Sequence, residues 1–234
     1  MKGYGQFCPV AKAAEILSER WTLLIIRELL SGSHRFNDIR RGIPLISTSL
    51  LTQRLKSLEE QGVVERRHAA RGLAWEYHLT RAGEELAPMV EMAGRWGQRW
   101  VRSHLLEEDL DVGLLMWDMR RRIQVHALPW TPVCIHFRYP DVRPAHRDWW
   151  LLVEDTEVDL CPKDPGHEPD LDVVSDLRTM SAIWIGSLSL QAAVDRGRVT
   201  LYGPLRLRRS MHHWLGLSVF ADEPQAVGNQ RFNP

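Results

Sequence analysis

Residues 46–62, ISTSLLTQRLKSLEEQG, place two kinds of side chain on opposite faces of one predicted helix. Leu51, Leu55 and Leu58 recur at helical spacing and form an apolar stripe. The opposite face carries hydroxyl, amide and cationic groups but no acid until the far end of the helix. The major groove of DNA admits one helix, which must offer uncharged hydrogen-bonding groups to bases and cations to phosphates. This face has the chemistry that such a contact requires.

The surrounding residues extend the same chemistry. Residues 35–81 hold nine Lys and Arg against five Asp and Glu, so the local field attracts phosphate. A plain helical bundle with a solvated polar face is the alternative interpretation of the pattern. The candidate DNA-binding residues are Arg35, Ser47, Thr48, Ser49, Thr52, Gln53, Arg54, Lys56, Arg66, Arg67 and Arg71.

The elements around this helix follow a recognisable order. Helices are predicted to start at Cys8-Pro9 and to cover 19–30, 35–41 and 47–62, because Pro suits the first helical position and Gly ends helices. Two strand-like runs then flank a basic turn, and a long helix is predicted from Arg81 to about Leu105. Three helices, a recognition helix, a hairpin and a last helix are the order of a winged helix-turn-helix.

Composition indicates two domains. Residues 1–106 hold 16 Lys and Arg against 11 Asp and Glu, whereas residues 107–234 hold 14 against 19, so the halves carry +5 and −5. Three cysteines cannot all pair within one chain, which favours a reducing cytoplasm, and no apolar run approaches the ~18 residues of a membrane span. We expect domains at 1–106 and 110–222, followed by a tail at 223–234.

The second half shows no catalytic set. The histidines lack H-x-x-x-H and H-E-x-x-H spacing, and no Gly-rich phosphate loop or G-x-S-x-G is present. Cys161, Asp164 and His167 lie in a Pro-rich segment that we interpret as a connector rather than a metal site. Strands come first and helices follow, which predicts an α+β domain with helices on one face of a sheet. We expect no enzyme activity, no cofactor and no metal.

The first half resembles the HxlR family of bacterial winged-helix regulators. The resemblance rests on CP at the start, WTLLIIREL, RFNDIR, the Leu-rich recognition helix and YHLTRAG after the wing, and it covers residues 8–102. It implies a transcription regulator that binds double-stranded DNA as a homodimer built from the first helix and the helix after the wing. The dimerisation residues expected on the last helix are Leu86, Met89, Val90, Ala93, Trp96 and Trp100; packing of this stripe onto the second domain is the alternative.

Cys8 is a candidate redox sensor. A thiol at a helix N-terminus feels the positive end of the helix dipole, which favours the thiolate and its reactivity. Several HxlR-like regulators resemble one another in using a cysteine at this position to sense oxidants. The alternative is a small packing residue.

The second half resembles the sterol-carrier-protein-type fold over residues 125–220. The resemblance rests on a strand, paired helices, A-x(3)-G-R-V-T-L-Y-G and a closing helix. It implies a hydrophobic tunnel for a lipid-like or aromatic effector, while a filled core is the alternative. The ligand-binding candidates are Phe137, Trp149, Trp150, Trp184, Leu188 and Trp214.

Together these features predict a cytoplasmic DNA-binding regulator that responds to a hydrophobic small molecule or to oxidation of Cys8. A carrier or enzyme for an apolar molecule, which uses the winged helix only to dimerise, is the alternative function. A specific DNA footprint separates the two.

Overall fold

The computed structural model describes residues 3–69, 74–101 and 107–224. Contacts divide the chain into unit 1, Met1–Trp96, and unit 2, Gly97–Pro234. The sequence placed the domain boundary after residue 106. The contacts divide the chain earlier because Gln98 Nε2 donates to Ile185 O at 3.1 Å and Arg99 pairs with Glu223 at 3.0 Å, so the last turn of one helix belongs to unit 2.

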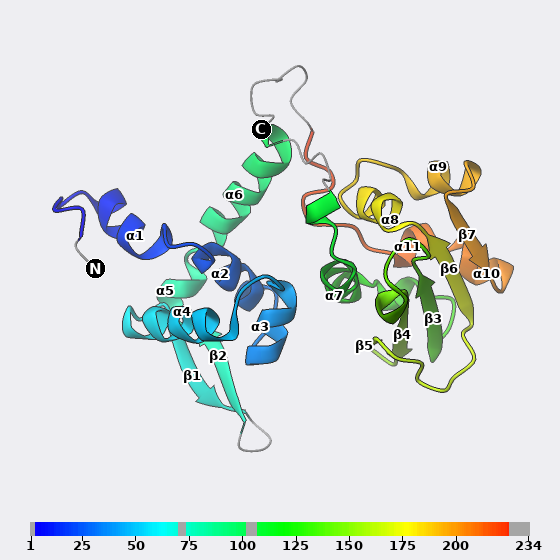
Figure 1. Cartoon of the computed structure of the whole chain (residues 1–234), viewed down its shortest axis with the longest axis horizontal. Helices are drawn as coiled ribbons and strands as arrows, with labels where there is room; N and C mark the ends of the chain where they lie inside the picture. The colour runs from blue at the N-terminus through cyan, green and yellow to red at the C-terminus, as the bar shows by residue number, and fades with distance from the viewer. Residues whose placement is uncertain (1–2, 70–73, 102–106, 225–234) are drawn as a thin grey trace. The chain divides into compact units, whose positions relative to one another are not determined.

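Unit 1 has the predicted winged helix-turn-helix order (Figure 1). Its hydrophobic core contains side chains from every helix of the first sixty residues, among them Leu17, Ile25, Ile39 and Leu55. The elements are α1 (Pro9–Leu17), α2 (Thr22–Leu30), α3 (Phe36–Gly42), α4 (Thr48–Glu60), β1 (Val64–His68), β2 (Trp75–Leu79), α5 (Arg81–Glu84) and α6 (Ala87–Trp100).

The long helix predicted from Arg81 to Leu105 is wrong in one respect, because α5 and α6 are separate helices. Thr80 caps α5 by accepting a hydrogen bond from Gly83 N at 3.2 Å. Pro88, in the first turn of α6, lacks the backbone N–H that a continuous helix would need there, so the chain starts a new helix at Ala87. Residues 102–106, where the predicted helix was to end, lie outside the described part of the chain.

Unit 2 is an α+β domain with a mixed five-stranded sheet in the order β5-β4-β3-β6-β7. Strands β3 and β6 are parallel, and the other neighbours are antiparallel. The strands are β3 (Val133–Arg138), β4 (Asp148–Glu154), β5 (Glu157–Cys161), β6 (Leu171–Ser175) and β7 (Val199–Tyr202). The helices are η1 (Glu107–Asp109), α7 (Val112–Arg122), η2 (Val125–Ala127), η3 (Pro144–His146), α8 (Leu177–Trp184), α9 (Leu190–Asp195), α10 (Leu205–Arg209) and α11 (Met211–Trp214).

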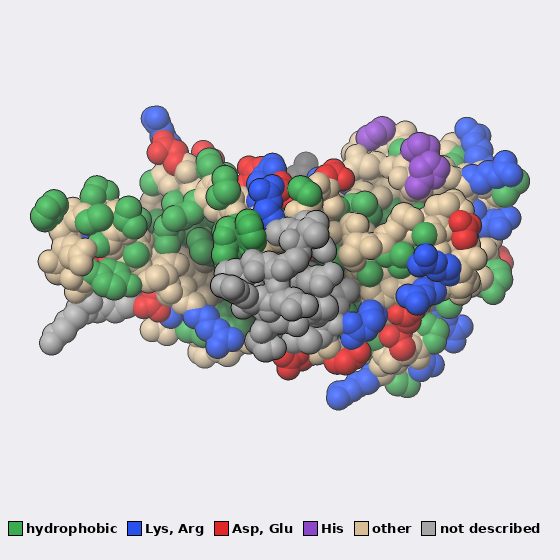
Figure 2. All heavy atoms as spheres, turned by 90° about the horizontal axis from the view of Figure 1, so that it is seen from above, with side chains coloured by type: hydrophobic (Ala, Val, Ile, Leu, Met, Phe, Trp, Pro, Cys, Tyr) green, Lys and Arg blue, Asp and Glu red, His purple; other side chains and the backbone are tan. Residues whose placement is uncertain are grey.

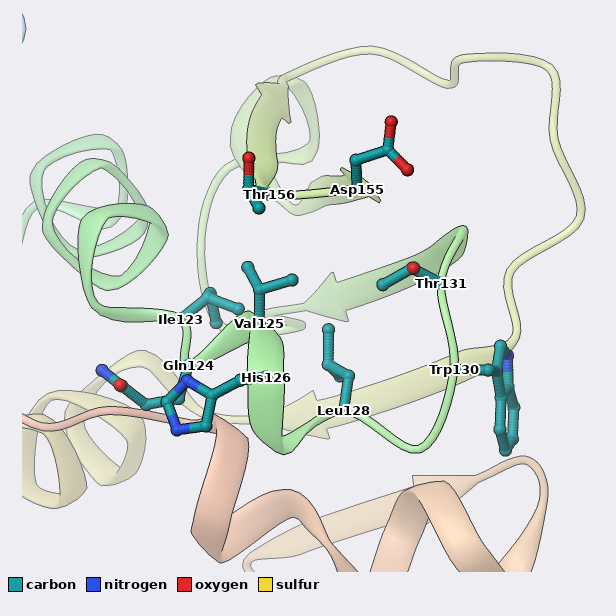
Figure 3. A pocket seen from close by; sticks show the side chains of 9 residues that line it. All are labelled: Ile123, Gln124, Val125, His126, Leu128, Trp130, Thr131, Asp155 and Thr156. Atoms are coloured by element: carbon teal, nitrogen blue, oxygen red, sulfur yellow. The ribbon is translucent and has the colours of Figure 1, made fainter.

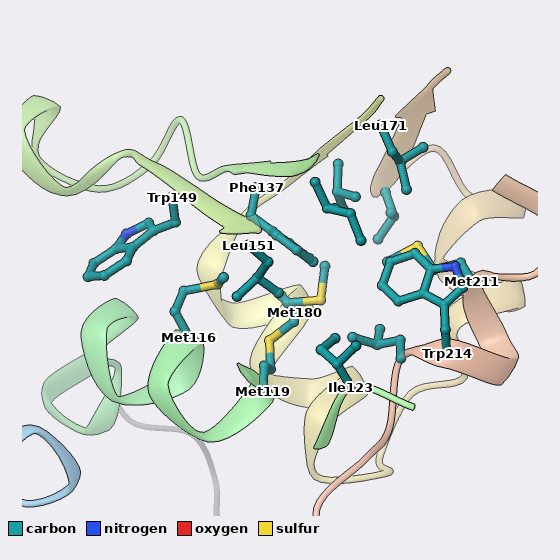
Figure 4. Packing of buried hydrophobic residues seen from close by; sticks show 14 of the residues in the cluster. Met116, Met119, Ile123, Phe137, Trp149, Leu151, Leu171, Met180, Met211 and Trp214 are labelled. Atoms are coloured by element: carbon teal, nitrogen blue, oxygen red, sulfur yellow. The ribbon is translucent and has the colours of Figure 1, made fainter. Parts of the chain in front are cut away.

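One face of this sheet forms the core. Burial alternates along β4 and β6, so every second residue points to the helices. Figure 4 shows Phe137, Leu151 and Leu171 from the strands facing methionines of α7, α8 and α11. Methionine has three flexible bonds and fills irregular gaps, which suits a layer packed by short helices that meet the sheet at different angles.

Candidate nucleic-acid interface and cavities

Helix α4 buries one stripe and exposes another. Leu51, Leu55 and Leu58 are buried in the unit 1 cluster. The opposite face is exposed and consists of Thr48, Ser49, Thr52, Gln53 and Lys56. The structure thus brings five of the candidate DNA-binding residues together on one exposed helical face.

The start of α4 is fixed by its own polar side chains. Ser47 Oγ accepts a hydrogen bond from Leu50 N at 3.3 Å and lies 3.2 Å from Ser49 Oγ, so Ser47 is the N-cap. Thr52 Oγ1 donates to Thr48 O at 2.9 Å, which leaves its oxygen free to accept and its methyl group exposed. No hydrogen bond to the Gln53 amide occurs among the described residues. Gln53 therefore keeps both a donor and an acceptor for an incoming partner.

A buried carboxylate holds the turn between α3 and α4, and sequence reasoning missed it. Glu28 is fully buried and accepts hydrogen bonds from Arg27 Nη2 at 2.8 Å and Ser33 Oγ at 3.1 Å. The same Arg27 nitrogen donates to Gly42 O at 2.7 Å, at the end of α3. The sequence feature that could have indicated it is Glu28 within the apolar run TLLIIRELL, because a carboxylate buried there needs a hydrogen-bonding or charged partner.

Arg54, a candidate phosphate contact, is used within unit 1. Its Nη2 donates to Glu19 Oε2 at 2.5 Å, and its side chain is only 17% exposed. Lys56 is 76% exposed, and its ammonium lies 3.7 Å from Glu60, in a pair that water screens. Of the two α4 cations, Lys56 is the one with its charge at the surface.

The β1–β2 hairpin presents further cations. The Arg66 guanidinium lies 4.3 Å from the centre of the Trp75 ring, and Arg67 pairs with Glu65. Arg35, at the start of α3, is 63% exposed and lies 3.5 Å from Glu76. Arg71, the candidate at the tip of the wing, lies outside the described residues. The exposed cations Arg35 and Arg66 both lie close to the β1–β2 hairpin, since Glu76, the partner of Arg35, is a residue of β2.

Helix α6 carries apolar side chains that its own chain leaves accessible. No residue of α6 is buried, and Met89 is 49% and Trp96 50% exposed. Leu86, just before the helix, and Val90 are half-buried against the unit 1 cluster. The other two dimerisation candidates, Ala93 and Trp100, are exposed, and Trp100 belongs to unit 2 by its contacts. Together these side chains form an exposed apolar surface on α6.

The three cysteines have different surroundings, and all are free thiols. Cys8 is the N-cap of α1 and is half-buried. Cys134 is buried in β3, and this burial, with nearby carboxylates such as Asp170, raises the pKa of its thiol to about 11. Burial also raises the pKa of Cys161.

Three of the six ligand-binding candidates, Phe137, Trp149 and Trp214, lie in the packed core of unit 2. Trp184 and Leu188 lie at its margin, and Trp150 stacks on His136 with ring centres 4.7 Å apart. None of the six lines either of the two cavities of this unit described below. These candidates therefore form packing contacts in this structure.

The smaller of these cavities measures about 460 Å³. Figure 3 shows Ile123, Val125 and Leu128 of the η2 segment on one side of it and Asp155 and Thr156 of the β4–β5 turn on the other. The larger, about 730 Å³, lies between α9, β7 and the α10–α11 segment. Within the described ranges, no group of three or more His, Cys, Asp or Glu is arranged to hold a metal ion, and no helix is long and apolar enough to cross a membrane.

The helix-turn-helix α3–α4 and the β1–β2 hairpin define unit 1 as a winged helix-turn-helix domain. Residues 16–105 match the family described as HxlR-like helix-turn-helix. The HTH-type transcriptional regulator YvaP of Bacillus subtilis is 39% identical over 104 residues, which are 44% of this chain and 96% of YvaP. Because nearly all of YvaP is matched, the chain belongs to the HxlR-like family.

Two further comparisons match a similar share of the chain. The HTH-type transcriptional regulator sll1512 of Synechocystis is 31% identical over 110 residues, 47% of this chain and 82% of sll1512. The solved structure of the reduced form of the transcriptional regulator YodB from B. subtilis is 35% identical, with a TM-score of 0.36, and the match covers 40% of this chain and 93% of YodB. Each of these matches spans less than half of the present chain.

Proposed function

We propose that this chain is a DNA-binding transcription regulator that works as a homodimer and responds to a small molecule bound in unit 2. The observation that carries the proposal is the exposed face of α4, where Gln53, Thr52 and Ser49 offer hydrogen-bonding groups beside Lys56. An amide can make two hydrogen bonds to an adenine edge, whereas Lys contacts phosphate as a point charge.

The cations beside α4 supply sequence-independent affinity. Arg35 and Arg66 are exposed, and Arg71, which lies outside the described residues, is proposed for the same role. Each phosphate that a cation neutralises releases counterions and steepens the salt dependence of binding. Arg54 is not part of this set, because its charge is committed to Glu19.

Dimerisation through α6 is proposed from its exposed apolar side chains, above all Met89 and Trp96. A dimer can hold two α4 helices about one DNA turn, roughly 34 Å, apart and so engage two half-sites. Oxidation of Cys8 is a second proposed input, supported by its position at the start of α1.

The sterol-carrier-type identity of unit 2 is likewise a proposal. It is supported by the order of β6, α8, α9, β7 and the closing helices, which is the order that the sequence predicts. A carrier or enzyme for an apolar molecule is the second candidate function, and the 730 Å³ cavity favours it if DNA binding fails.

The test uses a DNA site selected by the protein from a random pool. Gln53→Ala should weaken binding to that site by about 1–3 kcal/mol and leave binding to unrelated DNA nearly unchanged, because only base contacts are lost. Lys56→Ala should weaken both and reduce the salt slope by about one unit.

Two matched variants control the comparison. Gln61→Ala changes an exposed amide at the far end of the same helix, and Lys163→Ala removes an exposed lysine from unit 2; both should bind as the parent does. If no DNA site can be selected, or if Gln53→Ala and Lys56→Ala behave alike across sequences, the proposed role of α4 is wrong.

A further inference from the structure

A cavity of unit 2 lies at one edge of its sheet. Strand β7 is the last strand on that side, and the cavity lies between it, α9 and the α10–α11 segment. Its volume of about 730 Å³ falls within the range of small-molecule sites in proteins, roughly 300–1,000 Å³. It therefore has room for a ligand.

Part of the lining of this cavity is aliphatic. Its apolar lining residues come from three elements, α9, β7 and α10, and are Leu190, Val194, Val199, Leu201 and Leu205. Leu205 is half exposed, so part of this apolar surface contacts water when nothing is bound. Removing such surface from water favours a ligand with a hydrocarbon portion.

The charged groups of the lining are all of one sign. Arg208 and Arg209 line the cavity beside the ring of His212, and no carboxylate is among the lining residues. The neighbouring acid, Asp195, accepts a hydrogen bond from Gln191 at 2.7 Å. Figure 2 shows Lys and Arg side chains, with histidines nearby, at the end of unit 2 where Figure 1 places β7 and α10.

This concentration of positive charge runs against the charge of the surrounding domain. Residues 196–213 contain five arginines, two histidines and no acid, although residues 107–234 as a whole carry 14 Lys and Arg against 19 Asp and Glu. In addition, Arg208 Nε is buried without a hydrogen-bond partner among the described residues. A buried donor of this kind is stabilised when a ligand acceptor reaches it.

We propose that this cavity binds an amphipathic anion, which is a hydrocarbon chain or ring with one carboxylate or phosphate head group. The head group would lie at Arg208, and the hydrocarbon would lie along the apolar residues of β7 and α9. The claim that this ligand is an effector of DNA binding rests on the proposed function, whereas the claim that the cavity binds it does not. A nucleic-acid backbone would use the arginines but not the aliphatic lining, so DNA is an outcome of the test rather than the proposal.

The test titrates the full-length protein with decanoate by calorimetry and compares 1-decanol, decyltrimethylammonium, acetate and decyl phosphate. Decanoate should bind once per chain. Decanol and decyltrimethylammonium should bind at least tenfold more weakly because they lack the anion, and acetate likewise because it lacks the chain. The ratio of decyl phosphate to decanoate affinity identifies which head the site prefers.

Variants locate the site. Arg208→Gln should weaken decanoate about tenfold, the size of one lost charge-assisted hydrogen bond. Leu205→Asp places a negative charge beside the aliphatic lining at a half-exposed position, and it should weaken decanoate binding by more than tenfold. Arg143→Gln removes an exposed arginine elsewhere in unit 2 and should leave binding within twofold.

Several results would overturn the inference: no saturable decanoate binding, equal binding of decyltrimethylammonium, or unchanged affinity in Arg208→Gln. If Arg208→Gln lost affinity for DNA but kept its affinity for decanoate, Arg208 would be a nucleic-acid contact, and this result would also overturn the inference.

The same titrations separate this inference from the proposed function. If decanoate binds as stated and the protein selects no DNA site, the proposed function fails while the binding site stands. If DNA is bound specifically and decanoate is not, the reverse holds. An effector role requires decanoate to change DNA affinity at least about fivefold, with a reciprocal change in its own affinity.

Discussion

Adding one methyl group at Gly42 should destabilise unit 1 through Glu28. A Cβ built on Gly42 would lie 2.0 Å from both the Cδ and the Oε2 atoms of Glu28, so the carboxylate must move. That movement strains the hydrogen bonds from Arg27 and Ser33, both to a fully buried charge. Hydrogen bonds to charged groups contribute about 1.5–3 kcal/mol each. Because Ala is favoured over Gly within a helix by roughly 0.5–1 kcal/mol, the net cost of Gly42→Ala should be about 2–4 kcal/mol.

The measurement is urea unfolding, followed by hydrogen exchange in peptides around Ile25 and Leu51 to assign the loss to unit 1. A control is Gly97→Ala, since a Cβ there meets nothing within 4 Å apart from its chain neighbours and the backbone of its own helix; that variant should be neutral or slightly stabilised. In a Glu28→Ala background the added cost of Gly42→Ala should fall below about 1 kcal/mol. An equal cost in both backgrounds, or a cost near zero in the parent, would refute the reasoning.

Three further outcomes follow from the buried and exposed side chains. Burial raises the pKa of Tyr139 well above its usual range, so its phenol stays protonated in the folded state and ionises on unfolding at high pH. Relative to Tyr139→Phe, the free energy of unfolding of unit 2 should be unchanged below about pH 10 and fall by about 1.4 kcal/mol for each pH unit above it. The same pH dependence of the urea midpoint for both proteins from pH 9 to 11 would contradict this. With its pKa near 11, the Cys134 thiol should be about one thousandth thiolate at pH 8, and its rate of reaction with iodoacetamide should rise roughly tenfold for each pH unit up to pH 11. Cys8 should be labelled first at pH 7. Equal labelling rates of the two cysteines, measured by peptide mass spectrometry, would make Cys8 a packing residue. Met89→Glu should shift the protein from dimer to monomer in sedimentation, while an unchanged dimer would place the interface elsewhere.

Local pattern was sufficient for most of the fold. The winged helix-turn-helix of unit 1 was predicted and is confirmed, and the α+β layer of unit 2 has strands where the alternating runs place them, such as β4 and β5 around the Asp155 turn. These elements follow from periodicity and from turn residues, which are properties of neighbouring positions.

What the sequence could not provide were pairings between distant residues. Arg54 and Glu19 are 35 positions apart, so the helical pattern alone assigned Arg54 to the exposed face. The resemblance to the sterol-carrier-protein-type fold implied a tunnel, but a sequence does not determine whether side chains such as Trp214 fill a space or line it. The 730 Å³ cavity is defined by short stretches of α9, β7 and α10, none of which has a pattern of its own.

Helix α6 also constrains how the length of this protein can change. Met89, Val90 and Trp96 lie on the same fourteen-residue helix as Gln98 and Arg99, which bond to unit 2. Each residue turns an α-helix by about 100°, so a single insertion between Trp96 and Gln98 would rotate one set of side chains by that angle relative to the other. Seven added residues, close to two full turns, would restore their alignment. Eleven added residues come equally close to three full turns, so among descendants that keep both sets of contacts we expect insertions in α6 of about seven or eleven residues rather than of one.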